Sequence, residues 1–112
     1  MKKVDAIDHI MTPERQDHVV EVHPEVSFTF LAGRPMTYHK ATVEGRAERL
    51  DALRKAFLDI DDHAKIWLPG SRPDDLLDAF VAAWSARRWV DGSYKRLGGE
   101  RDERGLRMEI IA

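Results

Sequence analysis

The 112-residue sequence contains no cysteine. Disulfides, thiolate metal sites, iron–sulfur clusters and cysteine nucleophiles are therefore excluded within it. Its five histidines match no HExxH or other zinc-binding spacing, so we expect no zinc. A chain without cysteine fits a reducing compartment, and we predict a cytoplasmic location.

Long hydrophobic runs and an excess of one charge are also missing. No apolar run approaches the roughly 18 residues of a membrane span, and the start Met1-Lys2-Lys3-Val4-Asp5 lacks the apolar core of a signal peptide. The formal net charge is −2, which gives no overall basic field to attract nucleic acid. Hydrophobic residues make up 43%, too many for a disordered chain. We expect a folded protein with no membrane partner.

The length corresponds to one domain. Apolar spacing predicts a helix over residues 3–11, and a β-prone run predicts a strand over residues 18–22. Pro24 suits the first position of a further helix, which extends over residues 25–31 and stops near Gly33.

A loop over residues 33–42 follows, and Thr42 has the side chain of an N-cap for the next helix. A polar connection over residues 59–70 comes after that helix. The helix is expected to carry an apolar face formed by Ala47, Leu50, Leu53, Phe57 and Leu58.

The strongest helical signal comes next. Ser71-Arg72-Pro73-Asp74 matches a capping box, and the helix is expected to end at Asp91-Gly92. A loop with Gly98-Gly99 then leads to a closing strand over residues 106–111. The i, i+3, i+4, i+7 stripe of this helix is formed by Leu77, Phe80, Val81 and Trp84. The predicted order is α-β-α-α-α-β, a helix-rich α/β (α+β) domain with two short strands.

One group of acids lies around the end of the first predicted strand. Glu21 ends that strand, and Glu25 lies in the first turn of the following helix. Carboxylates are ligands that Mg²⁺ prefers, and a pair of such ions can clamp a phosphodiester during cleavage. Alternatively, Glu25 complements the helix dipole and His23 is a hydrogen-bonded structural histidine.

A second acidic group lies in the long helix. Asp75 and Asp78 share a helix face, and Asp78 borders the apolar stripe, where a carboxylate needs a partner. That partner is a cation, a donor or a metal. The alternative is a salt bridge to a nearby arginine.

Four residues near the start of a helix form a candidate phosphate or nucleic-acid site, because helix N-termini bind anions. An ordinary solvated face is the alternative. These residues are Lys40, Thr42, Arg46 and Arg49.

Several separate motifs resemble one family. They are Glu-Val-His-Pro-Glu-Val-Ser-Phe (21–28), Leu-Ala-Gly-Arg-Pro (31–35), Lys40 with Thr42, Gly-Arg-Ala-Glu-Arg-Leu (45–50), Asp-Asp-Leu-Leu-Asp-Ala-Phe-Val-Ala-Ala-Trp-Ser-Ala-Arg-Arg (74–88) and Gly-Leu-Arg-Met-Glu-Ile (105–110). In this order they resemble the domain of unknown function 429 family, predicted to be RNase H-like nucleases. The resemblance implies an RNase H-like α/β fold and a Mg²⁺ or Mn²⁺ cofactor.

The resemblance also implies roles for individual acids. Glu21 and Glu25 match the strand-end acids, and Asp75 and Asp78 match the late-helix acids. All four would then be catalytic, with Glu21, Asp75 and Asp78 as metal ligands. The Asp-Asp-x-x-Asp-Ala pattern is also similar to the last helix of RuvC-type resolvases.

The sequence departs from the family at its start. Family members are longer and begin with a strand that carries a Gly-Val-Asp-Gly-like motif and the first metal-binding Asp; a later strand carries an Asp-x-Pro-Ile-Gly-like motif. Neither motif is present here. The sequence is therefore expected to be a single partial domain, similar to the C-terminal half of the family.

Two functions follow as hypotheses. The first is a metal-dependent nuclease that cleaves phosphodiester bonds only if the missing acids come from a partner, either a second copy or a chain supplying the N-terminal half. The second is a non-catalytic remnant or oligomeric module that binds protein or nucleic acid, using the seven basic and four acidic residues of segment 85–107. Two short strands do not form a stable sheet alone, so we predict a homodimer that completes it.

Overall fold

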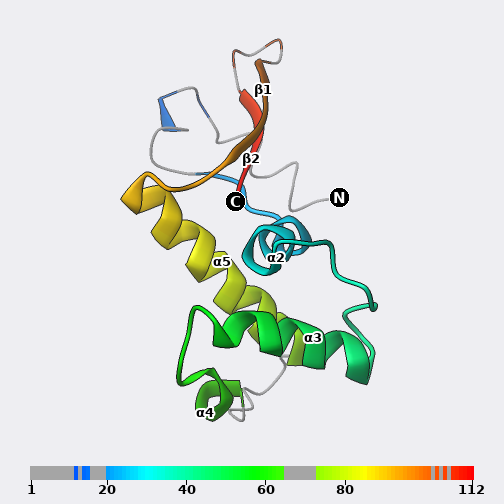
Figure 1. Cartoon of the computed structure of the whole chain (residues 1–112). Coiled ribbons are helices and arrows are strands. Elements are labelled where there is room, and N and C mark those ends of the chain that lie inside the picture. The colour runs from blue at the N-terminus through cyan, green and yellow to red at the C-terminus, as the bar shows by residue number, and fades with distance from the viewer. Residues whose placement is uncertain are drawn as a thin grey trace.

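The computed structural model describes residues 12, 14–15, 20–64, 73–101, 103, 105 and 107–112. The fold is a mixed α+β arrangement in which helices precede a two-stranded antiparallel sheet (Figure 1). No helix in these ranges is long and apolar enough to cross a membrane. The elements are α2 (Pro24–Ala32), α3 (Val43–Arg54), α4 (Ile60–Ala64), α5 (Pro73–Asp91), β1 (Arg96–Arg101) and β2 (Arg107–Ile111).

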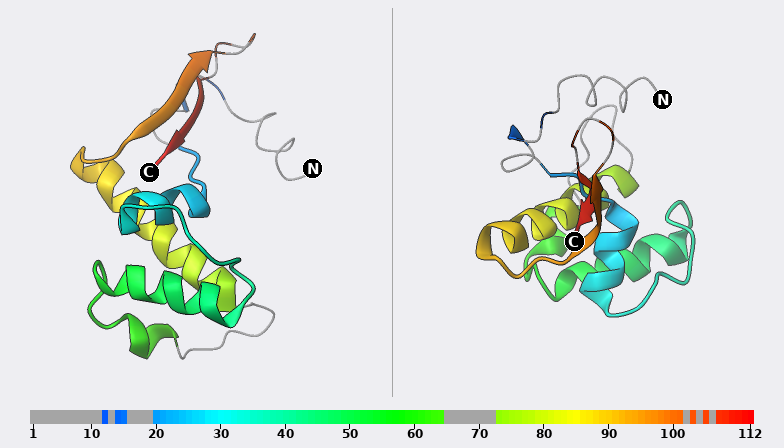
Figure 2. Two further views of the ribbon diagram at one scale, coloured as in Figure 1. Left: turned by 45° about the vertical axis from the view of Figure 1, so that its right-hand side comes forward. Right: turned by 90° about the horizontal axis from the view of Figure 1, so that it is seen from above.

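Helix α5 is the central element of the helical part. It contacts α2, α3 and α4, and its C-terminal end leads into β1 (Figures 1 and 2). Its N-terminal end lies beside α3, on the side of the molecule away from the sheet (Figure 1). The long helix therefore connects a helical core at one end to the sheet at the other.

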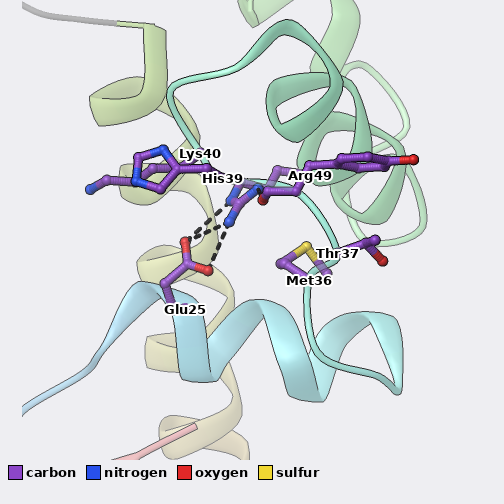
Figure 3. Close-up of a pocket in the computed structure, with 7 residues that line it drawn as sticks. Glu25, Met36, Thr37, His39, Lys40 and Arg49 are labelled. Atoms are coloured by element: carbon purple, nitrogen blue, oxygen red, sulfur yellow. Dashed lines mark hydrogen bonds and ion pairs between the residues drawn. The ribbon is translucent and has the colours of Figure 1, made fainter.

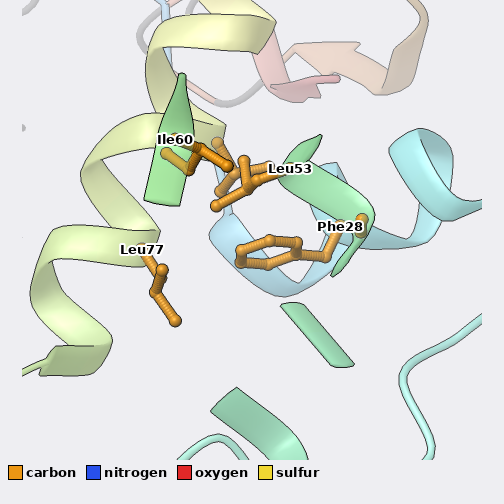
Figure 4. Close-up of a cluster of buried hydrophobic side chains, with 6 residues drawn as sticks. Phe28, Leu53, Ile60 and Leu77 are labelled. Carbon is orange, nitrogen blue, oxygen red and sulfur yellow. The ribbon is translucent and has the colours of Figure 1, made fainter. Parts of the chain in front are cut away.

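The hydrophobic core joins the four helices of the described ranges. Phe28 of α2, Leu53 of α3 and Ile60 of α4 are fully buried, and Leu77 and Val81 of α5 complete the cluster (Figure 4). The other two members of the predicted α5 stripe are partly buried against this core. The helical period of α5 is thus confirmed, because the core takes one face of the helix.

One polar contact crosses this packing. The hydroxyls of Ser27 in α2 and Ser85 in α5 lie 2.7 Å apart, and both side chains are completely buried. Each hydroxyl satisfies the other, so neither carries the cost of an unpaired buried group. The bond fixes which turn of α2 faces which turn of α5.

The sheet is an irregular hairpin. Arg96 pairs with Ile111 at one end, and the register shifts between Gly98 and Glu100, where Gly98 and Gly99 have φ values of 81° and 115°. On the other side of β2, Val22 forms an isolated parallel bridge with Ile111. The predicted closing strand is confirmed as β2. Of the strand predicted over residues 18–22, the structure describes a single bridging residue, Val22.

The structure corrects three expectations. The segment with Gly98-Gly99 is not a loop but strand β1, because pairing with β2 supplies its backbone partners. The connection over residues 59–70 includes helix α4. Helix α3 ends at Arg54 and Leu58 is 94% exposed, so Leu58 does not belong to the predicted face, whereas Leu50, Leu53 and Phe57 do pack in the core.

After α3, the amide of Phe57 donates to the carbonyl of Leu53, and the amide of Ile60 donates to the carbonyl of Phe57. These hydrogen bonds turn the chain so that Ile60 enters the core. The helices predicted over residues 25–31 and from Pro73 to about Val90 are confirmed. The helix predicted over residues 3–11 and the capping residues Ser71 and Arg72 lie outside the described residues.

The serine pair predicts a non-additive stability effect. Ser27→Ala or Ser85→Ala alone leaves one buried hydroxyl without its partner, which we expect to cost about 1–3 kcal/mol. The double variant removes both polar groups and should be less destabilised than the sum of the two. Urea unfolding of the four proteins gives the coupling energy. Strict additivity would show that the hydroxyls do not depend on each other.

Candidate functional site

The connection between α2 and α3 is held in place by one carboxylate of α3. Glu48 accepts hydrogen bonds from the amides of Thr37 and Tyr38 at 2.9–3.1 Å, and from the guanidinium of Arg34 at 2.6 Å. Its side chain is only 8% exposed. The Arg34 hydrogen bond, helped by the two amides, lowers the pKa of Glu48 from 4.5 to about 2. The loop is therefore fixed around an ionised carboxylate.

The same loop closes tightly on the start of α3. Thr42 is the N-cap, as predicted: its hydroxyl accepts from the Gly45 amide at 2.9 Å and donates to the His39 carbonyl at 2.7 Å. A Cβ at position 45 would overlap that His39 carbonyl. Gly45 is therefore required in the first turn of the helix by close approach of the loop.

Arg49 joins the loop to both neighbouring helices. Its Nε and Nη2 groups donate to both carboxylate oxygens of Glu25 at 2.8–3.2 Å, and Nη1 donates to the carbonyls of Tyr38 and Gly45 at 3.0 and 2.9 Å. The Arg49 side chain is 3% exposed. All five N–H groups thus have acceptors, which makes this a bidentate, fully satisfied buried arginine.

A second ion pair connects the loop to α5. The ammonium of Lys40 lies 3.7 Å from the carboxylate of Asp78, and the Lys40 side chain is 41% exposed. The partner that Asp78 needs at the border of the apolar face therefore includes a cation, as one of the predicted possibilities had it, and this cation is a lysine and not the arginine of the alternative.

These contacts shape an open hollow with a volume of about 430 Å³. Figure 3 shows Glu25 rising from α2 to meet Arg49, with Lys40 and His39 beside them. The residues that line the hollow are Glu25, Met36, Thr37, Tyr38, His39, Lys40 and Arg49.

The structure brings four predicted site residues together. Glu25, Lys40 and Arg49 line the hollow, and Asp78 reaches it through its ion pair with Lys40. Thr42 caps α3 close by. These residues come from α2, the loop, α3 and α5, so tertiary packing makes the cluster.

The other predicted residues lie elsewhere. Arg46 folds back to donate to the carbonyls of Thr42 and Ala41 at the start of α3. Glu21 is exposed, and its carbonyl accepts from the amide of Ile111 at 2.9 Å, beside the sheet. Asp75 is an exposed residue of the first turn of α5.

The fit to a metal ion is incomplete. Across the described ranges, no three His, Asp or Glu residues gather where they could hold a metal. Glu25 and Asp78 have the hard oxygen atoms that Mg²⁺ prefers, but each faces a cation of this chain. The described residues therefore do not fit Mg²⁺ without ligands from elsewhere. The metal set Glu21, Asp75 and Asp78 stays a prediction.

Residues 1–103 match the family model described as Protein of unknown function (DUF429). The chain belongs to the DUF429 family. The family resemblance of the sequence motifs is thereby confirmed over nearly the whole chain. Searches of curated proteins and of solved structures gave no significant match.

Sequence reasoning missed two residues that shape this site, Glu48 and Gly45. Glu48 lies within the motif Gly-Arg-Ala-Glu-Arg-Leu (45–50), but the motif gave it no role, because its partners are an arginine and two backbone amides of the preceding loop. Gly45 carried a signal that could have been used, since glycine is disfavoured in a helix and its presence so near an N-cap points to a close approach.

Glu48 also predicts an acid-sensitive loop. Because its pKa is lower in the folded protein, the ionised carboxylate stabilises the fold above pH 4.5, and this contribution is lost as the pH falls towards about 2. We expect Glu48→Gln to be less stable than the wild type at pH 7, with a flatter decline in stability between pH 4.5 and 2. Thermal unfolding followed across this range measures both effects.

The exposed Glu44 of the same helix provides the matched control. Glu44→Gln should retain the wild-type decline between pH 4.5 and 2. Equal curves for wild type and Glu48→Gln would contradict the role given to Glu48.

Proposed function

We propose that this DUF429 chain binds nucleic acid at the hollow, as a member of an RNase H-like nuclease lineage. The observation that carries the proposal is Lys40: this residue lines an open hollow, its ammonium lies 3.7 Å from the carboxylate of Asp78, and its side chain is partly exposed. A lysine ammonium is a flexible point charge that binds phosphate oxygens. A backbone phosphate is therefore the group that fits this position best.

The ion pair between Arg49 and Glu25 supports phosphate binding in a different way. Arg49 neutralises Glu25 with a bidentate contact, and Lys40 lies beside Asp78, so the two carboxylates do not leave an uncompensated negative field. Arg49 has its own donors engaged within the chain. We therefore assign Arg49 to positioning the loop and Lys40 to contacting the phosphate.

The binding proposal predicts salt-dependent affinity. Neutralising a phosphate releases counterions, so the affinity for a single-stranded oligonucleotide should fall as salt increases. Lys40→Ala should weaken binding and reduce the slope of log K against log[salt] by about 0.7. Fluorescence anisotropy with labelled oligonucleotides between about 50 and 200 mM salt measures this slope.

Lys55, an exposed lysine that follows α3 outside the hollow, offers the control. Lys55→Ala should keep the wild-type slope. Absence of binding at low salt, or a wild-type slope in Lys40→Ala, would exclude the hollow as the phosphate site.

Metal-dependent cleavage is the second candidate. The observation that favours it is that Glu25 of α2 lines the hollow and Asp78 of α5 pairs with Lys40, which also lines it, although the two acids are far apart in the sequence. Further carboxylates would come from a second copy or from a chain with the N-terminal half of an RNase H-like fold. The two-stranded sheet, with β1 at its edge, is the surface where such a chain would add strands.

Cleavage is tested with Mg²⁺ or Mn²⁺ and labelled DNA and RNA. If the second candidate holds, products appear only with the metal, and Asp78→Asn reduces their rate by at least about tenfold, as expected for loss of a group that acts on the reaction. Asp62→Asn, at an exposed aspartate of α4, should retain the rate. Binding without cleavage would leave the chain as a non-catalytic module.

A further inference from the structure

Tyr38 is an exposed aromatic residue on a fixed backbone. The residue is 52% exposed, and it lines the hollow together with His39 and Lys40. Its amide donates to Glu48 at 3.1 Å, and its carbonyl accepts from Arg49 at 3.0 Å. Two side chains of α3 thus hold the residue on both sides while its ring remains in solvent.

A single exposed aromatic residue needs no ligand to explain it. Tyr38 differs because the two α3 side chains that fix its backbone are themselves almost completely buried. A tyrosine ring has few rotatable bonds, so a ring on a fixed backbone loses little conformational freedom when it binds. The arrangement therefore preorganises an apolar flat surface in the hollow that Lys40 also lines.

We infer that Tyr38 stacks with an unpaired base while Lys40 contacts the phosphate of the same strand. The inference rests on the proposed nucleic-acid binding and names its substrate class, which is single-stranded nucleic acid. Bases within a duplex are already stacked on their neighbours, whereas the bases of single strands are available to aromatic side chains. An aromatic ring and a lysine in one hollow are the groups that single-strand binding sites combine.

The experiment compares two oligomers with equal numbers of phosphates. One is a labelled oligothymidylate of about 12 nucleotides, within known site sizes, and the other is the same backbone without bases. Anisotropy titrations at constant salt give both affinities. We expect Tyr38→Ala to weaken binding of oligothymidylate by roughly 5- to 150-fold, and to leave binding of the abasic oligomer unchanged.

Two further variants separate stacking from other effects. Tyr38→Phe keeps the ring and should retain the wild-type affinity for both oligomers. Tyr94, the other tyrosine of the chain, lies just before β1 and outside the hollow, so Tyr94→Ala should bind as the wild type does.

Three results would overturn the inference while leaving the proposed function intact. They are equal wild-type affinity for the two oligomers, an equal loss for both in Tyr38→Ala, and a loss in Tyr38→Phe as large as in Tyr38→Ala. If neither oligomer binds the wild-type protein, the proposed function fails and the stacking role fails with it.

Discussion

The buried guanidinium of Arg49 is the interaction on which the candidate site depends. Its five N–H groups bond to Glu25 of α2, to the carbonyl of Tyr38 in the loop and to its own helix at Gly45. A lysine has neither the planar fork nor the number of donors to join three segments in this way. The hollow exists because one charged side chain, taken out of water, satisfies groups from each of its walls.

The helical core supplies the rigidity that such a clamp needs. Phe28 packs beneath the site, and the Arg49 guanidinium lies over its ring at 5.7 Å from the centroid. The same α5 that buries Leu77 and Val81 also presents Asp78 to Lys40. Core and site therefore share one helix, with the apolar face on one side and the ion pair at its border.

The sequence predicted the helices well because α2 and α5 carry strong local signals, from Pro24 and from the α5 stripe. It could not predict β1, since a segment with Gly98-Gly99 becomes a strand only through pairing with β2. It identified Glu25 and Asp78 by residue type. Their cationic partners could not be predicted, because those pairs join segments that only the tertiary packing brings together.

The contact between Gly45 and the His39 carbonyl has a consequence for the evolution of the DUF429 chain. A side chain at position 45 is compatible only with a different path of the preceding loop. The glycine and the conformation of this loop therefore depend on each other. Relatives that replace this glycine should also differ in the length or composition of the segment before Thr42. The absence of a Cβ at position 45 thus restricts which loop conformation, and therefore which shape of hollow, a relative can have.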